Sequence, residues 1–221
     1  MRNLDNEYGN IFINGILMNK IYDGRPQYSN WGGLNDATRN QEFTSGSRPN
    51  DFGFGGILGV QAINTRASFM RTGTRLSFSG ANTNYSGRVM INHGSGVNAK
   101  GWAYAVSASY RTANEGFFEG TDYDAKSFFL SVEKKFSKQS LNLTAIYAQN
   151  SRGKNSPNTQ EVINLMNYRY NSYWGIQNGK KRNSRDKDVE EPLLILSHFL
   201  DISEKSSLNT NVSFQLGTIS N

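Results

Sequence analysis

The chain has 221 residues, enough for one large domain or two small ones, and it carries no cysteine, which excludes disulfides and thiolate metal sites. Its 22 glycines, 13 phenylalanines and 11 tyrosines against only 4 prolines favour a turn-rich, strand-rich fold and argue against disorder. The net charge of +6 comes without a recognition-helix pattern and without a basic run longer than Lys180-Lys181-Arg182, so nucleic-acid binding is not supported. Ordinary surface charge, or contact with anionic lipid headgroups, explains it instead.

The N-terminus carries no export signal. The stretch from Met1 to Asp5 has no apolar core and cannot serve as a secretory signal peptide. No run of about 18 apolar residues is present, so no transmembrane helix is expected. If the protein is exported, we expect its export signal to lie outside this chain.

Two regions of the chain differ in composition and in the pattern of apolar and polar residues. Residues 1–70 are irregular and rich in glycine and asparagine, whereas residues 74–217 repeat one unit, a strand-length stretch of alternating apolar and polar residues followed by a turn. The stretches that we predict to be strands are 74–82, 87–94, 101–111, 125–135, 140–149, 191–202 and 207–217.

The stretch at 101–111 shows the alternation best. Side chains of a strand point alternately to its two faces. One face is apolar, with aromatic residues near both ends, and holds Trp102, Tyr104, Val106, Ala108 and Tyr110. The other face is small or polar. A transmembrane β-strand needs about 9–11 residues of this pattern, so we predict that Trp102, Tyr104, Val106 and Tyr110 face lipid.

The stretch at 207–217 repeats the pattern. Its apolar face carries Leu208, Val212, Phe214 and Leu216, together with Thr210, and the opposite face carries Asn209, Asn211, Ser213 and Gln215. Phe214 is accordingly predicted to face lipid. Periodicity alone does not separate this reading from the edge of a soluble β-sandwich whose polar face meets bulk water.

The links between the predicted strands alternate in length. Those at 95–100, 136–139 and 203–206 are short and polar, whereas those at 112–124 and 150–190 are long. Outer-membrane barrels have short periplasmic turns and longer extracellular loops. Seven strands do not make a closed bacterial barrel, which uses an even number, so we expect the sequence to be part of a longer one.

The first seventy residues resemble the second half of the plug domain of a TonB-dependent outer-membrane receptor. The resemblance is carried by NIFINGILMN at 10–19, YSNWGGLNDATRNQEFTSG at 28–46 and FGFGGILGVQAINTR at 52–66. In the last segment, Gly55, Gly56 and Gly59 precede the stretch 60–66, as at the end of the family's plug. The segments 108–129 and 156–185 resemble the large receptors of this family that carry an N-terminal carboxypeptidase-regulatory-like domain.

The resemblance implies an all-β fold. Residues 1–70 would be the C-terminal part of the plug, and residues 71–221 the first strands of a transmembrane antiparallel β-barrel. The apolar stretch at 191–202 would pack its inner face against the plug. The TonB box, the first half of the plug and most of the barrel would lie outside this chain.

The same resemblance implies a function and a place. The protein would sit in the bacterial outer membrane and take up a bulky nutrient, such as a metal chelate, a vitamin or a glycan, driven by the TonB complex through the missing N-terminal segment. Outer-membrane lipid and lipopolysaccharide, the TonB complex and the imported ligand are its expected partners. The alternatives are a porin or enzyme barrel in the outer membrane, or a β-sandwich surface adhesin.

No catalytic constellation stands out, so we expect neither an enzyme nor a cofactor. His93 and His198 lie far apart in different predicted strands, and no calcium-loop spacing is present, so no metal site is predicted. The carboxylates Glu190 and Glu191 are expected to form a solvated rim.

Two segments are candidate ligand surfaces. The link at 150–190 combines aromatic residues, among them Tyr173 and Trp174, with many basic residues, and 160–168 could supply a short helix. The segment at 22–31 places Arg25, Tyr28 and Trp31 on a loop of the plug-like region. In both segments the alternative is packing, against the barrel rim in the first and between plug and barrel wall in the second.

The assignment of faces makes a prediction. Tyr104→Asp or Val106→Asp should block assembly, because a charge on the lipid face costs up to about 2–4 kcal/mol near the bilayer midplane for basic residues and less for acidic ones. On the opposite face, we expect Ser107→Asp to be tolerated. Equal yields of folded protein in the outer membrane for both kinds of variant would contradict the assignment.

Overall fold

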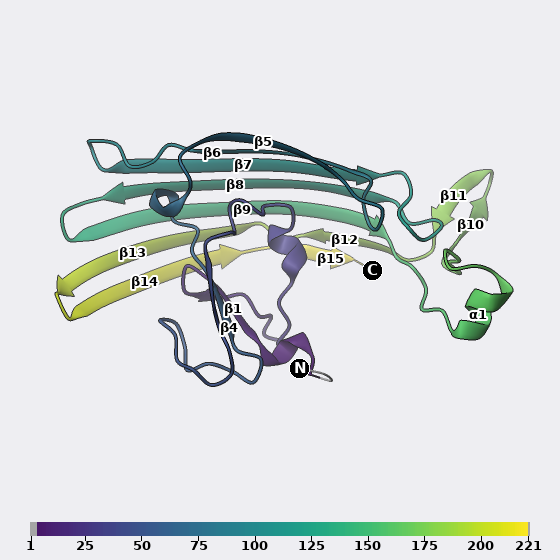
Figure 1. Cartoon of the computed structure of the whole chain (residues 1–221), viewed down its shortest axis with the longest axis horizontal. Helices are drawn as coiled ribbons and strands as arrows, with labels where there is room; N and C mark the ends of the chain where they lie inside the picture. Colours follow the sequence, from purple (N-terminus) through teal and green to yellow (C-terminus); the bar gives the residue numbers. More distant parts are fainter. Residues whose placement is uncertain (1–3, 221) are drawn as a thin grey trace.

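The computed structural model describes residues 4–220, and it shows a long curved antiparallel sheet with a smaller body beneath its concave face (Figure 1). We call the sheet the wall and residues 4–70 the inner segment. The N-terminus of the described chain lies in the inner segment, and the C-terminus lies at the edge of the wall. No helix among the described residues has the length and apolar character needed to cross a membrane.

The wall consists of seven strands in the order β14-β13-β9-β8-β7-β6-β5, all antiparallel to their neighbours. These strands are β5 (Gly73–Gly80), β6 (Gly87–Gly94), β7 (Trp102–Ala113), β8 (Tyr123–Lys135), β9 (Gln139–Gly153), β13 (Leu193–Ser203) and β14 (Ser206–Gln215). All seven predicted strands are therefore present, including the one at 191–202 that shows no clean alternation, and hairpins join them in chain order except across the long link after β9.

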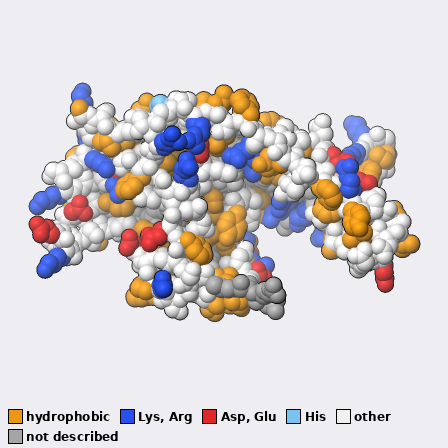
Figure 2. All heavy atoms as spheres, viewed as in Figure 1, with side chains coloured by type: hydrophobic (Ala, Val, Ile, Leu, Met, Phe, Trp, Pro, Cys, Tyr) orange, Lys and Arg blue, Asp and Glu red, His pale blue; other side chains and the backbone are white. Residues whose placement is uncertain are grey.

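The two faces of the wall differ as the alternation predicts. On β7, residues 103, 105, 107 and 109 are buried, whereas Trp102, Tyr104 and Tyr110 are exposed on the convex face. Neighbouring strands keep this register, since Tyr104 lies opposite Val132 and Ala105 opposite Ser131. Figure 2 shows apolar side chains along the upper, convex border of the molecule.

The end of β9 lies further out than the apolar pattern suggested. β9 continues to Gly153, because its last five residues pair with β12 (Asp186–Glu190), which itself pairs with the short β15 (Thr218–Ser220). These residues are polar, so hydrophobic periodicity gives no sign of them. Backbone hydrogen bonding continues past the point where the apolar band stops.

The inner segment, expected to be irregular, contains a small four-stranded sheet in the order β2-β1-β4-β3. Its strands are β1 (Asn10–Ile13), β2 (Ile16–Leu17), β3 (Gln41–Thr44) and β4 (Val60–Ile63), and three 3₁₀ turns, η1 (Asn6–Tyr8), η2 (Tyr28–Trp31) and η3 (Ala67–Phe69), connect or flank them. The strands have two to four residues each, too few for a periodic pattern to be read.

Glycine and asparagine supply the backbone conformations that this small sheet needs. Asn14 and Gly15 have φ of 48° and 88°, the two positive values that the tight hairpin turn between β1 and β2 requires. Gly59 has φ of 88°, and a side chain there would collide with the carbonyl oxygen of Thr44. A glycine at 59 is therefore needed for β3 and β4 to pair.

The main apolar core lies between the inner segment and the wall. Phe129, Ile146, Leu193 and Ile195 point inward from the wall, so the inner face of the stretch at 191–202 does pack as expected. The inner segment contributes Ile11, Ile13, Met18, Trp31, Leu34, Ala37, Ile63, Ala67 and Met70.

This packing corrects one expectation. Ser107 is only 1% exposed, and its hydroxyl donates to the carbonyl oxygen of Ile91, so its face is dry where the inner segment covers it. An aspartate at 107 would be a buried charge without a partner, and Ser107→Asp is therefore not a tolerated control.

The outermost strand offers a better matched pair. Val212 is 66% exposed on the convex face of β14, and its neighbour Ser213 is exposed on the concave face. We expect Val212→Asp to lower the yield of folded protein in outer membranes and Ser213→Asp to leave it near that of the unmodified protein. Heat-modifiable gel mobility of the membrane fraction measures this yield, and a similar loss for both variants would contradict the orientation of the wall.

Candidate functional site

A buried ion pair joins the inner segment to the wall. Arg66, just before η3, donates from Nη2 and Nε to Oε1 of Glu133 on β8, at 2.5 and 3.1 Å. The other carboxylate oxygen of Glu133 accepts from the backbone N–H of Ser68 at 2.9 Å. Glu133 is 0% exposed, so its charge is compensated entirely by groups of the inner segment.

Uncharged hydrogen bonds continue this contact. The side chain of Asn14 accepts from the N–H of Thr65 at 2.8 Å and donates to Thr144 on β9 at 3.3 Å. The hydroxyls of Thr65 and Thr144 lie 3.2 Å apart, and Asn142 accepts from the N–H of Ala67 at 3.3 Å. We call the set of Asn14, Thr65, Arg66, Glu133, Asn142 and Thr144 the polar seam.

The polar seam is the part of the interface that both bodies can expose to water, beside the apolar core that lies between them. A typical intramolecular hydrogen bond contributes only about 0.5–1.5 kcal/mol net, because the separated groups hydrogen-bond to water instead. The hydrogen bonds of the seam therefore specify the position of the inner segment on the wall. If the inner segment separates from the wall, the seam side chains on both sides can hydrogen-bond to water instead.

The three candidate residues of the inner segment lie in different environments. Arg25 pairs with Asp5 and Glu7. Tyr28 is 51% exposed, although burial of its hydroxyl raises the pKa of that group. Trp31 is 8% exposed and belongs to the core between inner segment and wall. Arg25 and Tyr28 are thus open to a ligand, whereas Trp31 holds the position that the packing alternative describes.

The long link after β9 contains one short helix and one hairpin. Residues 154–185, which we call the loop arm, contain the helix α1 (Gln160–Leu165), predicted from sequence, and a hairpin of β10 (Trp174–Gln177) and β11 (Lys180–Asn183). Asn178 and Gly179 form the turn of this hairpin with φ of 52° and 72°. The arm projects beyond one end of the wall, to the right in Figure 1.

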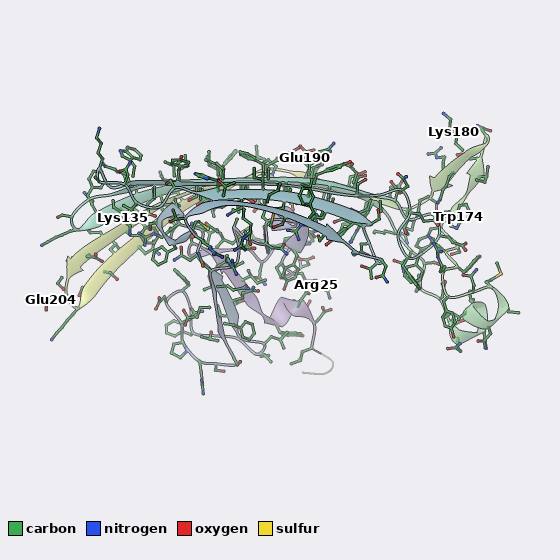
Figure 3. The ribbon with its side chains drawn as sticks, turned by 45° about the horizontal axis from the view of Figure 1, so that its top comes forward. Arg25, Lys135, Trp174, Lys180, Glu190 and Glu204 are labelled. Carbon is green, nitrogen blue, oxygen red and sulfur yellow. The ribbon has the colours of Figure 1, made fainter. Side chains whose placement is uncertain are left out.

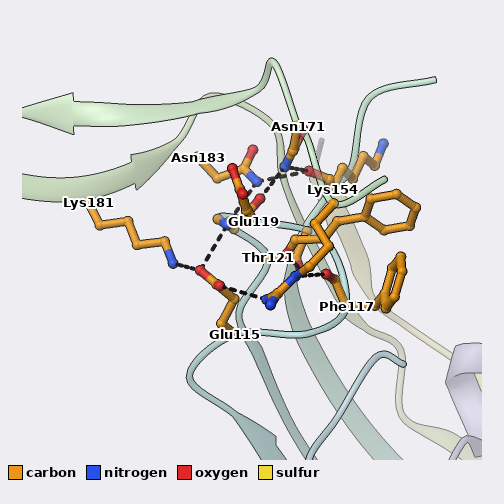
Figure 4. Close-up of polar contacts among 11 residues, drawn as sticks. Glu115, Phe117, Glu119, Thr121, Lys154, Asn171, Lys181 and Asn183 are labelled. Carbon is orange, nitrogen blue, oxygen red and sulfur yellow. Dashed lines mark hydrogen bonds and ion pairs between the residues drawn. The ribbon is translucent and has the colours of Figure 1, made fainter. Parts of the chain in front are cut away.

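A carboxylate ties the loop arm to the shorter loop 114–122 (Figure 4). Glu115 forms ion pairs with Lys181 and, at 3.1 Å, with Arg169, and it also accepts from the N–H of Gly120. The hydrogen bond from Lys181, together with that from Gly120, holds the pKa of Glu115 below its ordinary value.

Two asparagines add neutral bonds to this tie. Asn171 donates to the carbonyl oxygens of Glu119 and Lys154, at 2.8 and 3.1 Å, and Asn183 donates to those of Gly120 and Lys154, at 3.0 and 2.8 Å. The two loops are therefore fastened by side-chain amides to backbone carbonyls as well as by charge.

The aromatic candidates of the arm face its own basic residues. The ring of Trp174 lies 5.2 Å from the Lys181 ammonium and against Gly120, and the ring of Tyr173 lies 5.5 Å from the Arg185 guanidinium. Figure 3 shows Trp174 beyond the end of the wall, whereas Arg25 lies beneath the wall. The two predicted sets of ligand residues are therefore not brought together.

The structure brings together inner-face side chains that the sequence placed in separate segments. They lie on the concave face near the end of the wall that carries the long loops, and we call them the cationic belt: Arg88, Arg111, Arg152 and Lys187, with Tyr123 among them. Cross-strand pairing places Arg88 opposite Arg111, Arg152 opposite Tyr123, and Lys187 opposite Arg152. The last pair forms only because β12 returns alongside β9, which the sequence pattern did not show.

The belt borders a cavity of about 250 Å³ whose lining includes Tyr123, Arg152, Lys154, Asp122 and Phe118. Tyr123 lies beneath the Arg111 guanidinium, 5.5 Å from its ring centre, and accepts a hydrogen bond from Asn150 at 2.6 Å.

The remaining candidates for chemistry stay apart. Within residues 4–220 no cluster of three or more histidine, aspartate or glutamate side chains is arranged to hold a metal ion. His93 contacts Thr74 at 2.8 Å and His198 contacts Gln139 at 2.9 Å. Glu190 accepts a hydrogen bond from Tyr147 on the convex side of the wall.

No protein-family model matches the chain, and no curated protein matches it by sequence. Solved structures do match. The siderophore receptor PiuA from Acinetobacter baumannii aligns with 99% of the chain and 30% of its own length, at a TM-score of 0.68 and 14% identity. The ferric-catecholate import receptor Fiu from E. coli aligns with 97% of the chain and 32% of its own, at a TM-score of 0.68 and 13% identity. The ferric enterobactin receptor PfeA from Pseudomonas aeruginosa aligns at 0.58 and 13%, over 97% and 34%.

These matches define the class of fold. The chain has the fold of part of these receptors, a partial antiparallel β-barrel wall with the inner segment against its concave face, which agrees with the fold that the resemblance predicted. It spans about a third of the length of the structures that it matches.

The buried ion pair predicts strong coupling between Arg66 and Glu133. Arg66→Met leaves a buried carboxylate without its charge partner and should lower the free energy of unfolding by roughly 3–5 kcal/mol. Arg66→Met combined with Glu133→Leu should cost less than Arg66→Met alone, because no buried charge remains. Urea titration followed by protease sensitivity of the inner segment measures these changes, and additive losses would show that the pair is not coupled.

The Glu115 tie predicts opening of the loops in acid. A carboxyl whose pKa is lowered in the closed form stabilises that form above its ordinary value of 4.5, and the stabilisation is lost as the pH falls through the lowered value. Pulsed EPR distances between spin labels on loop 114–122 and on the arm should therefore be constant from neutral pH to about 4.5 and broaden below it. Glu115→Gln should broaden them already at neutral pH, whereas Glu161→Gln, on α1, should behave as the unmodified protein does.

Proposed function

We propose that this chain supplies the plug end and the first barrel strands of an outer-membrane receptor that takes up a bulky nutrient with energy from a TonB complex. Residues 1–70 are the plug part and residues 71–221 the barrel part. The polar seam is the observation that carries the proposal, since an empty pore or a sandwich has no use for a separable body bonded to its inner face.

The convex face supports a lipid environment. Trp102, Tyr104, Val106, Tyr110 and Phe214 lie on it, and all but Val106 are strongly exposed. Lipid would cover them in the outer membrane, with Trp102 near one interface and Tyr110 near the other. A second protein sheet on this face, as in an adhesin sandwich, would need a partner that residues 4–220 do not provide.

The concave face argues against a porin. A passive pore keeps a water-filled lumen, whereas here Leu34, Trp31 and Ile13 pack against Phe129 and Ile146 of the wall. An enzyme barrel would need a cluster of acid, base or nucleophile near the outer rim, and no such constellation stands out in the sequence.

The solved relatives bear on the ligand. Their names describe receptors for siderophores, ferric catecholates and ferric enterobactin. Among the three ligand classes considered, a metal chelate is therefore favoured over a vitamin or a glycan. Arg25, Tyr28, Tyr173 and Trp174 remain candidate ligand residues, with Trp31 as a packing residue of the same loop.

Tethering the plug to the wall tests the proposal. The Thr65 and Thr144 hydroxyls lie 3.2 Å apart, so Thr65→Cys with Thr144→Cys places two thiols close enough to bond after a small shift. We expect the oxidised double variant of the intact gene product to reach the outer membrane and to lose uptake, and a reductant to restore it. Each single cysteine variant is the matched control.

Three labelled probes cover the ligand classes: ferric enterobactin, cyanocobalamin and maltoheptaose. Energised uptake of at least one, abolished by a protonophore and by the oxidised tether, is the expected result. Uptake that is unchanged by the protonophore and by the oxidised tether would identify a passive pore. Recovery of the protein in the soluble periplasmic fraction would favour the sandwich adhesin.

A further inference from the structure

We infer that the convex face of the wall, at the end that carries the short turns, binds the headgroup of an anionic phospholipid, whose chains lie along the apolar surface beside it. We call the four basic residues of this site the lysine rim: Lys100, Lys134, Lys138 and Lys205. The inference rests on the proposed function, because it needs the wall to stand in a membrane, and it names one lipid partner of that wall. In the proposed receptor the short turns face the periplasm, so the lipid belongs to the periplasmic leaflet of the outer membrane.

The short turns gather these lysines at one end of the wall. Figure 1 shows the turns after β6, β8 and β13 together at its left end. Lys100 lies in the first turn, Lys138 in the second and Lys205 in the third, and all three side chains are exposed. Lys134 lies near the end of β8, directly opposite the convex-face residue Trp102 of β7.

Basic side chains outnumber the free carboxylates at this end. The three turns with their adjoining strand ends are residues 95–101, 133–139 and 200–206. They hold five lysines and three carboxylates, and one of these carboxylates, Glu133, is buried against Arg66. The remaining two are Asp201 and Glu204. None of the ion pairs within residues 4–220 includes a lysine of the rim, so the rim keeps a positive charge that a phosphate can compensate.

Lys134 is held where a lipid headgroup would meet the wall. Its ammonium lies 5.1 Å from the ring centre of Trp102 and 5.5 Å from that of Phe136, and it donates to the carbonyl oxygen of Lys100. Both rings are nearly half exposed, at 46% and 49%. The rings and the carbonyl position the ammonium without cancelling its charge. An ammonium has three N–H donors, so two remain for the oxygens of a phosphate.

The surface beside Lys134 suits the chains of the same lipid. Two residues further along the strands, toward the middle of the wall, Tyr104, Val132, Leu143 and Leu196 lie in one row across four strands. All but Val132 are strongly exposed. A phospholipid carries its phosphate directly next to its hydrocarbon chains, so a cation at the edge of an apolar surface fits a lipid better than it fits free phosphate.

The opposite rim of the convex face has the opposite charge. Cross-strand register places Asp124 and Asp188 on either side of Ser151, and Glu190 lies nearby on the same side of the wall. The basic residue on the strands there is Lys126, which pairs with Asp124 at 3.5 Å. An anionic headgroup is therefore favoured at the lysine rim and not at the other end of these strands, which assigns the site to the leaflet at the short turns.

Lipid binding by the purified intact gene product tests the inference. Native mass spectrometry measures binding of dioleoyl phosphatidylglycerol, which is anionic, and of dioleoyl phosphatidylcholine, which has the same chains and no net charge. We expect phosphatidylglycerol to bind at least about fivefold more tightly, and this preference to fall as salt is added.

Variants at the two rims locate the site. Lys134→Gln should weaken binding of phosphatidylglycerol by about fivefold, the loss expected for one lysine beside an anionic headgroup, and leave phosphatidylcholine unchanged. Lys134→Arg keeps the charge and should bind phosphatidylglycerol as the unmodified protein does. Lys126→Gln, at the opposite rim of the same face, is the matched control and should change neither lipid. Heat-modifiable mobility verifies that every variant is folded.

The outcomes separate this inference from the proposed function. Equal affinity for the two lipids, full affinity for phosphatidylglycerol in Lys134→Gln, or an equal loss in Lys126→Gln overturns the lipid site, even if uptake remains energised. Displacement of the lipid by excess glycerol phosphate, which has no chains, would reveal a bare phosphate site and also overturns it. Preference for phosphatidylglycerol at the lysine rim, with no energised uptake of any probe, leaves the lipid site standing and overturns the receptor.

Discussion

The structure depends on one constraint: the concave face of the wall has to be polar enough to form part of a lumen and yet be buried beneath the inner segment. Buried polar groups are tolerated only when they are hydrogen-bonded, and a buried carboxylate only when its charge is compensated. Glu133 satisfies both conditions through Arg66 and the Ser68 N–H. The short neutral side chains of Thr65 and Thr144 do so by contacting each other.

The convex face, in contrast, is apolar and exposed. Its aromatic and aliphatic side chains, from Trp102 on β7 to Phe214 on β14, form an apolar surface far broader than the isolated exposed apolar residues that are normal on soluble proteins. In the proposed receptor, the same strands would separate two environments, hydrocarbon outside and a partly polar protein interface inside. Because strand side chains alternate, a shift of one residue would exchange the two faces, which fixes the register strongly.

Sequence reasoning succeeded where one physical pattern repeats over many residues. Six of the seven wall strands and their faces follow from the alternation of period two, the strand at 191–202 follows from its apolar character alone, and the short turns and long loops follow from the spacing between strands. It failed for the inner segment, whose strands are set by tertiary pairing and are shorter than any readable period. Two Asn-Gly pairs, at 14–15 and 178–179, were the available signals for its hairpin and for that of the arm.

The cationic belt could not be predicted from the sequence for a different reason. Arg152 and Lys187 are 35 positions apart in a stretch read as one loop, and only the pairing of β12 with β9 makes them neighbours. Sequence shows that both are basic, but not that they share a face.

The arrangement along the interface has a functional logic. Arg111 contacts the glycine pair 32–33 at one end of the interface, and the polar seam and the apolar core together hold its middle. Separation of the two bodies would therefore expose apolar side chains such as Phe129 and Ile146 to water, which opposes it. In the proposed receptor the polar seam would lower the total cost, because its groups can hydrogen-bond to water once exposed, so a pull from the TonB complex would mainly have to supply the cost of uncovering the apolar core.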